Sequence, residues 1–130
     1  MGAFDALRIA GSSLGMHQTW LDVLGHDLAN LNTMRPTDGD AFQGQMLIAE
    51  ARADGGVRVA GVALTDPEGV LVHDPDHPLA DAEGYVRAPA VDMAGTLTQL
   101  VMAQRGYQAA VQVTKVAQDD YQSAIQIGAR

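Results

Sequence analysis

Apolar residues recur at seven-residue intervals in the first part of the chain. One series is Leu7, Leu14, Leu21 and Leu28, and Ala10, His17, Leu24 and Leu31 follow three positions after each member. Such a pattern is typical of an α-helix that packs along one seam, as in a coiled coil. All five prolines lie between positions 36 and 89, so no proline interrupts a helix on either side of that stretch. We therefore predict a long helix at each end of the chain.

The C-terminal part repeats the arrangement. Its seven-residue series is Met93, Leu100, Tyr107, Thr114 and Tyr121, with Leu97, Val111 and Ile125 beside it. A second apolar stripe follows two residues after the first, as Ile9, Met16 and Val23 at one end and Met102, Ala109 and Val116 at the other. Two residues correspond to about 200° of rotation, so this stripe lies on nearly the opposite face of each helix. The pattern predicts helices that require partners on two sides, with a helix pair folded on its own small core as the alternative.

The middle of the chain indicates β-structure and turns. We predict a strand over 57–64 with a bulge at Gly61, a type I turn over 66–69, a partner strand over 70–72, a third strand over 85–87, and a loop over 33–45. The fold class is therefore α+β: long N- and C-terminal helices that pack as a coiled-coil-like pair, with a small β-rich insert between them. The expected segments are 1–35 (N-terminal assembly helix), 36–92 (acidic β/loop insert) and 93–130 (C-terminal assembly helix).

Charge is concentrated in the insert. The chain has a formal net charge of −8, and residues 36–92 alone carry 11 acidic side chains against three arginines. The two ends are close to neutral, which suits helices that pack together beside a solvated insert. Binding of nucleic acid is not expected, because phosphate neutralisation requires clustered lysine and arginine.

Several other classes are disfavoured by composition. The chain has no cysteine, so it has no disulfide and no thiolate nucleophile. No stretch approaches the roughly 20 apolar residues that span a bilayer, so direct membrane insertion is not expected. Asp5 lies where a signal peptide carries basic residues, and we expect no cleavable signal peptide.

Candidate groups for chemistry are few. The densest cluster is His73-Asp74-Pro75-Asp76-His77. Its prolines disfavour the helix that would bring both histidines to one metal ion, so a solvated turn is the preferred interpretation. His26 and Asp27 point about 100° apart on a helix, His17 lies on the seam, and Gly55-Gly56 lacks the phosphate-loop pattern. We expect no enzymatic activity, no metal and no cofactor.

Three motifs resemble those of the flagellar basal-body rod and hook family, in particular its proximal-rod branch of C type. They are residues 27–33 (DLANLNT), 72–81 with 84–92 (VHDPDHPLAD and GYVRAPAVD), and 104–110 (QRGYQAA). Asp27, Ala90 and Ala110 stand where that family usually has asparagine. The family's motif residues fall on Asn30, Asn32, Thr33, Gly84, Tyr85, Pro89, Val91, Arg105 and Tyr107.

The resemblance implies a structural subunit of the proximal rod, which polymerises through its terminal helices into the drive shaft that transmits motor torque. Its partners would be copies of itself, other flagellar rod proteins and the flagellar type III export apparatus, which would deliver it unfolded to the periplasmic part of the basal body. The ends of a monomer would be largely disordered until assembly. The expected assembly interface is Leu7, Leu14, Leu21, Leu24, Leu28, Leu31, Leu97, Leu100, Tyr107, Val111, Tyr121 and Ile125.

Two alternatives stay open. The chain could belong to another rod segment or to the hook of the same family, although its short insert favours the proximal rod. A small metal-dependent enzyme is the alternative from a different class, and it would use His73, Asp74, Asp76 and His77.

Overall fold

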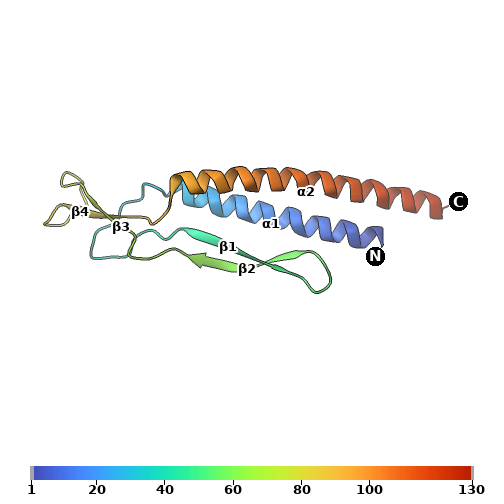
Figure 1. Cartoon of the computed structure of the whole chain (residues 1–130), viewed down its shortest axis with the longest axis horizontal. Helices are drawn as coiled ribbons and strands as arrows, with labels where there is room; N and C mark the ends of the chain where they lie inside the picture. The colour runs from blue at the N-terminus through green and yellow to red at the C-terminus, as the bar shows by residue number, and fades with distance from the viewer. Residues whose placement is uncertain (1, 130) are drawn as a thin grey trace. The chain divides into compact units, whose positions relative to one another are not determined.

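The chain forms two long helices separated in sequence by two small β-sheets. A computed structural model describes residues 2–129. The elements are α1 (Ala3–Ala29), β1 (Gln45–Ala51), β2 (Val57–Leu64), β3 (Val70–His73), β4 (Tyr85–Ala88) and α2 (Met93–Gly128), as labelled in Figure 1. The α+β class predicted from the sequence is therefore confirmed, with helices of 27 and 36 residues.

Helix α1 ends at Ala29, six residues before the end of the expected N-terminal segment. The carbonyl groups of the last helical turn have no partner within the helix. The Asn30 side-chain amide donates to the carbonyl oxygen of His26 at 2.9 Å and so satisfies one of them. Thr33 Oγ1 in turn donates to Asn30 Oδ1 at 3.0 Å. The polar residues of the first motif therefore close the helix.

Helix α2 begins at Met93 directly after an acidic cap. Asp92 Oδ2 accepts a hydrogen bond from the backbone N–H of Gly95 at 2.9 Å. An aspartate in this position satisfies a free N–H group and complements the positive end of the helix dipole. The helix begins at residue 93, where the sequence places the start of the C-terminal segment.

The strand pairing differs from the expected one. β1 pairs with β2, and β3 pairs with β4. β3 runs antiparallel to β4, with Leu71 opposite Arg87. The prediction that residues 70–72 pair with 57–64 is therefore wrong. The predicted turn before β3 is present, with the N–H of Gly69 donating to the carbonyl of Asp66 at 3.1 Å. However, β2 pairs with β1, a strand that the sequence did not reveal.

That additional strand is β1. Its apolar run, Met46 to Ile48, is short and is followed by alternating small and charged residues. A run of this length does not distinguish a strand from a piece of helix by periodicity. The connection to β2 closes tightly, since the N–H of Arg52 donates to the carbonyl of Gly56 at 3.0 Å.

The described chain divides into two compact units. One contains residues 2–21, 48–61 and 101–129, and the other contains residues 22–47 and 62–100. Both helices contribute residues to each unit.

In the first unit, small side chains lie between α1 and α2. The buried ones are Ala10, Ala103, Ala110 and Ala117. Phe4 lies against Tyr121, with ring centroids 6.3 Å apart. His17, further along α1, lies against Gly106, which precedes Tyr121 in α2, so the helices are antiparallel. The seam between the helices is therefore lined mainly by alanine. On α2 the buried alanines lie three positions after Leu100, Tyr107 and Thr114, which belong to the seven-residue series.

The tip of the β1–β2 hairpin also packs on α1 in this unit. Ser12 Oγ accepts from the N–H of Val57 at 3.1 Å and donates to the carbonyl of Ile9 at 2.6 Å. Gly55 and Gly56 have φ angles of 86° and 89°, and a Cβ on Gly56 would lie 2.6 Å from Ser12 Oγ. Glycine is therefore required there both by backbone conformation and by space. Ile9, a member of the second apolar stripe, contacts this hairpin within the same chain.

In the second unit, Arg87 connects three segments. Its guanidinium donates to the carbonyl of Glu68 at 2.6 Å and to the carbonyl of Thr37 at 2.8 Å. Its backbone forms an antiparallel bridge with Arg35, with hydrogen bonds of 2.8 and 2.9 Å. The neighbouring Val86 is fully buried. One side chain thus fixes the loop, the turn and β4 around a small core.

Replacing Arg87 by lysine tests this connection. A lysine ammonium keeps the charge but lacks the planar fork that reaches both carbonyl groups. We expect Arg87→Lys to lower the free energy of unfolding by about 1–2 kcal/mol, measured by urea denaturation. Arg58→Lys, at an exposed ion pair with Glu50, is the matched control and should change stability by less than about 0.5 kcal/mol. Equal effects of both variants would contradict the connecting role.

Candidate assembly interface

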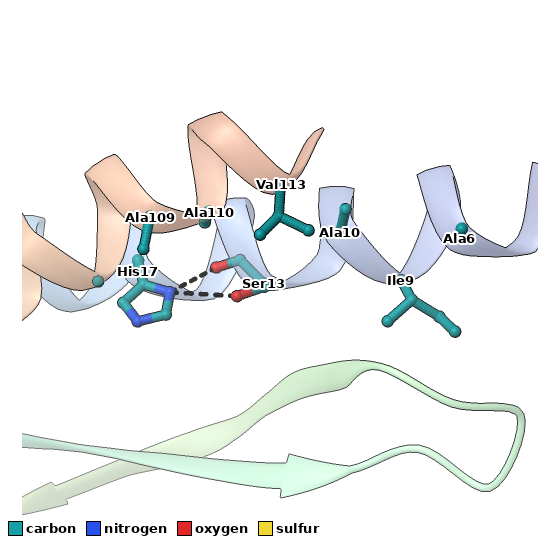
Figure 2. A pocket seen from close by; sticks show the side chains of 9 residues that line it. Ala6, Ile9, Ala10, Ser13, His17, Ala109, Ala110 and Val113 are labelled. Carbon is teal, nitrogen blue, oxygen red and sulfur yellow. Dashed lines mark hydrogen bonds between the residues drawn. The ribbon is translucent and has the colours of Figure 1, made fainter. Parts of the chain in front are cut away.

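An apolar groove lies along the helix pair of the first unit, and we call it the small-residue groove. It has a volume of about 560 Å³. Its lining residues are Ala6, Ile9, Ala10, Ser13, His17, Gly106, Ala109, Ala110 and Val113. Figure 2 shows that α1 and α2 both contribute side chains to it. Five of the nine lining residues are alanine or glycine, which have too little side chain to fill the groove. Val113, which also lines the groove, is 58% exposed.

Among the residues that line the groove, His17 has the only ring, and this ring carries polar nitrogen atoms. Its Nδ1 lies 2.8 Å from the carbonyl oxygen of Ser13 and 3.4 Å from Ser13 Oγ (Figure 2). A carbonyl oxygen only accepts, so the neutral ring carries its proton on Nδ1. A Cβ on Gly106 would overlap the ring, which means that this glycine leaves the space that His17 occupies. The seam histidine is therefore held by its own helix turn.

The residues expected at the assembly interface fall into three groups by exposure. Leu24 is buried. The half-buried ones are Leu7, Leu14, Leu21, Leu28, Leu31, Leu100, Tyr107 and Tyr121. The exposed ones are Leu97, Val111 and Ile125, at 41, 39 and 53%. The leucine series of α1 is thus partly covered within the chain. In contrast, the three α2 residues that lie four positions after members of the seven-residue series are exposed.

Most of the family-motif residues shape local structure. Gly84 is buried with a φ of 86°, a conformation that favours glycine. The following Tyr85 meets the ring of His73 edge-on at 4.9 Å. Pro89 is buried and Val91 is half-buried. Asn30 and Thr33 close α1 as described above. In contrast, Asn32 and Arg105 are exposed, and Tyr107 is half-buried on the seam.

Asp27, which replaces the usual asparagine of its motif, has a structural role that the sequence did not reveal. The residue is 5% exposed, and its two carboxylate oxygens accept from the N–H of Gln45 at 3.0 and 2.9 Å. Burial raises the pKa of this carboxyl above its ordinary value, against the opposing effects of the Gln45 hydrogen bond and the charge of His26. Asp27 therefore anchors the start of β1 at the end of α1.

Asp81 organises the turn before β4. Its carboxylate accepts from the N–H groups of Glu83 and Tyr85 and from Thr37 Oγ1, at 3.0, 2.8 and 2.8 Å. The Tyr85 hydrogen bond, followed by that of Thr37, holds the pKa of Asp81 below its ordinary value. Aspartate in such a turn could have been foreseen from the side chain's tendency to bond backbone groups two residues later.

The candidate groups for chemistry do not converge. His73 packs on Tyr85, while His77 Nδ1 accepts from the N–H of Leu79 at 3.1 Å. His26 contacts Phe42, with ring centroids 5.4 Å apart, and so does not form a dyad with its neighbour. Within residues 2–129, no group of three histidine, cysteine, aspartate or glutamate side chains is placed to hold a metal ion. Over the same residues, neither helix is sufficiently long and apolar to traverse a bilayer.

Comparison with known proteins gives the class. The family described as flagellar basal body rod FlgEFG protein C-terminal matches residues 82–127, which include β4 and most of α2. The flagellar basal-body rod protein FlgC of Salmonella typhimurium is 36% identical over 118 residues, which cover 87% of this chain and 88% of that protein. FlgC of Bacillus subtilis is 29% identical over 149 aligned positions, covering 98% of this chain and 99% of that protein.

These similarities define a structural protein of the flagellar basal-body rod. The chain belongs to the FlgC family of rod proteins.

Overpacking the alanine seam tests how closely the helices approach. Ala103 is 0% exposed, and leucine at this position has no room without displacement of α1. We expect Ala103→Leu to lower the free energy of unfolding by about 1–3 kcal/mol, measured by urea denaturation. Ala124→Leu, at an exposed position of the same helix, should have an effect within about 0.5 kcal/mol. An equally small effect at both sites would show that the seam is loose.

Substitution of Asp27 tests the burial of its carboxyl. Because its pKa is raised on folding, the native state binds the proton more readily, and the free energy of unfolding falls as pH rises above 3.8 through the native value. Asp27→Asn imitates the neutral form and keeps an oxygen for the Gln45 N–H. We expect the variant to be more stable than the parent at neutral pH, with the difference shrinking as pH falls through the raised native pKa toward 3.8 and nearly absent below that value.

Thermal unfolding over a pH series measures that difference. The depressed pKa values of Asp54 and Asp81 act in the opposite direction, but they contribute equally to parent and variant and cancel in the comparison. Asp22→Asn, at an exposed position of α1, serves as the control. A stability difference independent of pH would contradict the assignment to Asp27.

Proposed function

We propose that this rod subunit assembles with copies of itself and with other flagellar rod proteins through its two terminal helices. The supporting observation is the number of large apolar side chains that α2 leaves exposed. Seven of them are 39 to 76% exposed: Val101, Met102, Val111, Val113, Val116, Ile125 and Ile127. Large apolar side chains left exposed in this number are typical of a surface that partners cover.

The proposed roles of the three segments follow from their difference in charge. Residues 1–35 and 93–130 are nearly neutral and apolar, and they are the proposed assembly helices. Residues 36–92 carry the net charge and the hydrogen-bonded turns, and they are proposed to remain solvated on the outside of the assembly. The twelve leucine, tyrosine, valine and isoleucine positions expected at the interface are proposed contacts on this basis.

Transmission of torque in the proximal rod is the mechanical part of the proposal. Shafts that transmit torque must resist shear, and close packing of alanine, leucine and valine between helices provides that stiffness. We propose a purely structural role without enzymatic activity, membrane insertion or nucleic-acid binding. Export through the flagellar type III apparatus, without a cleavable signal peptide, completes the proposal, with a location in the periplasmic part of the basal body.

A role in another rod segment or the hook is the second candidate. It is favoured by the match of residues 82–127 to a C-terminal family described as that of basal body rod FlgEFG proteins rather than of FlgC. The FlgC relatives, which cover most of the chain, favour the first candidate. Labelling of the subunit in purified basal bodies, followed by imaging, separates the two.

A charge on the α1 seam tests the role of the terminal helices. Leu21 is half-buried, and an aspartate there would lack both water and a partner once neighbours pack against it. We expect Leu21→Asp to abolish rod assembly and swimming, measured in a strain that lacks its own copy of the gene. Asp76→Ala, at an exposed position of the insert, is the control and should swim normally. Normal motility of the Leu21 variant would refute assembly through this helix.

A further inference from the structure

Strand β3 is an open edge of its small sheet in the second unit. It pairs with β4 on one side, and β4 is bridged to Arg35 on its other side, so β3 lies outermost. All four residues of β3 are exposed, and three of them are apolar: Val70, Leu71 and Val72, at 52, 55 and 36%. An edge with apolar side chains and open backbone groups is a template on which another chain can pair.

The register shows which backbone groups of β3 point outward. Opposite residues of an antiparallel pair alternate between pairs that exchange two hydrogen bonds and pairs that exchange none. Leu71 lies opposite Arg87, whose N–H and C=O are both bonded on the far side of β4, at 2.8 and 2.9 Å. His73 lies opposite Tyr85, whose N–H and C=O are both bonded to Asp81, at 2.8 and 2.9 Å. The N–H and C=O groups of Leu71 and His73 therefore point away from β4.

These outward groups are open to an added strand. Within residues 2–129 they have no hydrogen-bond partner, whereas Val72 lies opposite Val86 in a pair that exchanges both bonds. Two donors and two acceptors at every second residue are the pattern by which a sheet edge binds an extended peptide. No proline and no charged side chain lies within β3 to block such pairing.

Charge selects a basic partner. By sequence, the second unit (residues 22–47 and 62–100) carries 11 acidic side chains and two arginines. All four ion pairs of residues 2–129 lie in the first unit, so no arginine or lysine neutralises these carboxylates. Four exposed ones flank β3 in sequence, namely Asp66, Glu68, Asp74 and Asp76. An extended segment that carries lysine or arginine therefore gains electrostatic attraction on binding here.

A second copy of the chain does not supply such a segment. Its second unit carries the same negative charge and is repelled. The extended part of its first unit, residues 48–61, has two acidic side chains and two arginines, and all four already take part in ion pairs. The observations therefore favour a different protein as the occupant.

We propose that the free edge of β3 binds an extended, basic segment of another protein, which pairs with Leu71 and His73 as an added strand. The segment forms up to four backbone hydrogen bonds with these two residues. Its side chains alternate between the face of Val70 and Val72 and the opposite face. The inference goes beyond the proposed assembly through the terminal helices, because it assigns a binding role to the insert that this assembly leaves outside.

Amide hydrogen exchange of the isotope-labelled full chain, followed by NMR, tests the contact with a defined probe. The probe is the acetylated and amidated peptide KVTVRVTK. In the free chain we expect slow exchange of the Val72 N–H and fast exchange of the Leu71 and His73 N–H groups. We expect the peptide to shift these two amides with a dissociation constant of about 1 mM or less. At about ten times that constant their exchange should slow about tenfold, because only the free state exchanges.

Two control peptides separate backbone pairing from charge. Methylation of the two central backbone nitrogens keeps every side chain and the charge but removes a donor on each edge, and this peptide should not bind. The peptide EVTVEVTE, in which glutamate replaces each basic residue, should not bind either.

Two variants test the edge from the side of the protein. Leu71→Pro removes the outward N–H without removing a hydrogen bond between β3 and β4, which is where an edge strand tolerates proline. We expect it to lose the peptide while the Val72 N–H stays protected. Leu71→Ala keeps the N–H and should still bind the peptide.

Each contrary result overturns a stated part of the proposal. Absence of amide shifts at about 5 mM KVTVRVTK, or equal binding of the methylated peptide, would overturn pairing at this edge. Equal binding of EVTVEVTE would overturn the basic character of the partner. Slower exchange of Leu71 and His73 on addition of unlabelled full chain, in place of the peptide, would overturn the choice of another protein and assign the edge to a second copy.

Discussion

The close approach of α1 and α2 along an alanine seam determines which apolar side chains of the first unit are covered and which stay exposed. Ala10, Ala103, Ala110 and Ala117 are the buried side chains of the first unit's helix pair, and Gly106 leaves space for His17. Small side chains allow helix backbones to lie near one another, but each buries little apolar area. The larger apolar residues of α2 therefore lie outside the pair. A helix pair of this kind is weakly stabilised by itself and presents apolar surface to neighbours.

The insert is stabilised in a different way. Arg87 and Asp81 each bond to backbone or side-chain groups from other segments, and Asp27 bonds the start of β1. Hydrogen bonds are directional, so they define loop conformations even where the buried core is small. The strong negative charge of the same region favours hydration. The chain thus combines a charged insert of defined shape with helices that are incompletely covered.

The sequence predicted the parts governed by periodicity and turn chemistry. The two helices, the strand over 57–64, the turn ending at Gly69 and the start of α2 follow from the leucine spacing, the proline positions and the Asp-Pro-Glu-Gly signal. It did not predict β1 or the pairing of β3 with β4, because pairing is a tertiary choice between strands of similar composition. The buried alanine series was also missed, since alanine carries little weight in a search for large apolar side chains.

The candidate interface was predictable only in part. The leucine series of α1 and the outward residues of α2 could be identified from their seven-residue spacing. The groove could not, because it depends on the absence of side chains at Ala109 and Gly106 and on the exact pairing of two distant helices. The roles of Asp27 and Asp81 likewise depend on backbone groups that approach only in the folded chain.

The contact between Phe4 and Tyr121 has a consequence for the order of folding. Closing this pair joins nearly the two extremes of the chain, whereas the hairpin tip reaches Ser12 over a much shorter separation. Contacts that close longer loops are slower to form. On this basis we expect the first helix to meet the hairpin before it meets the last helix.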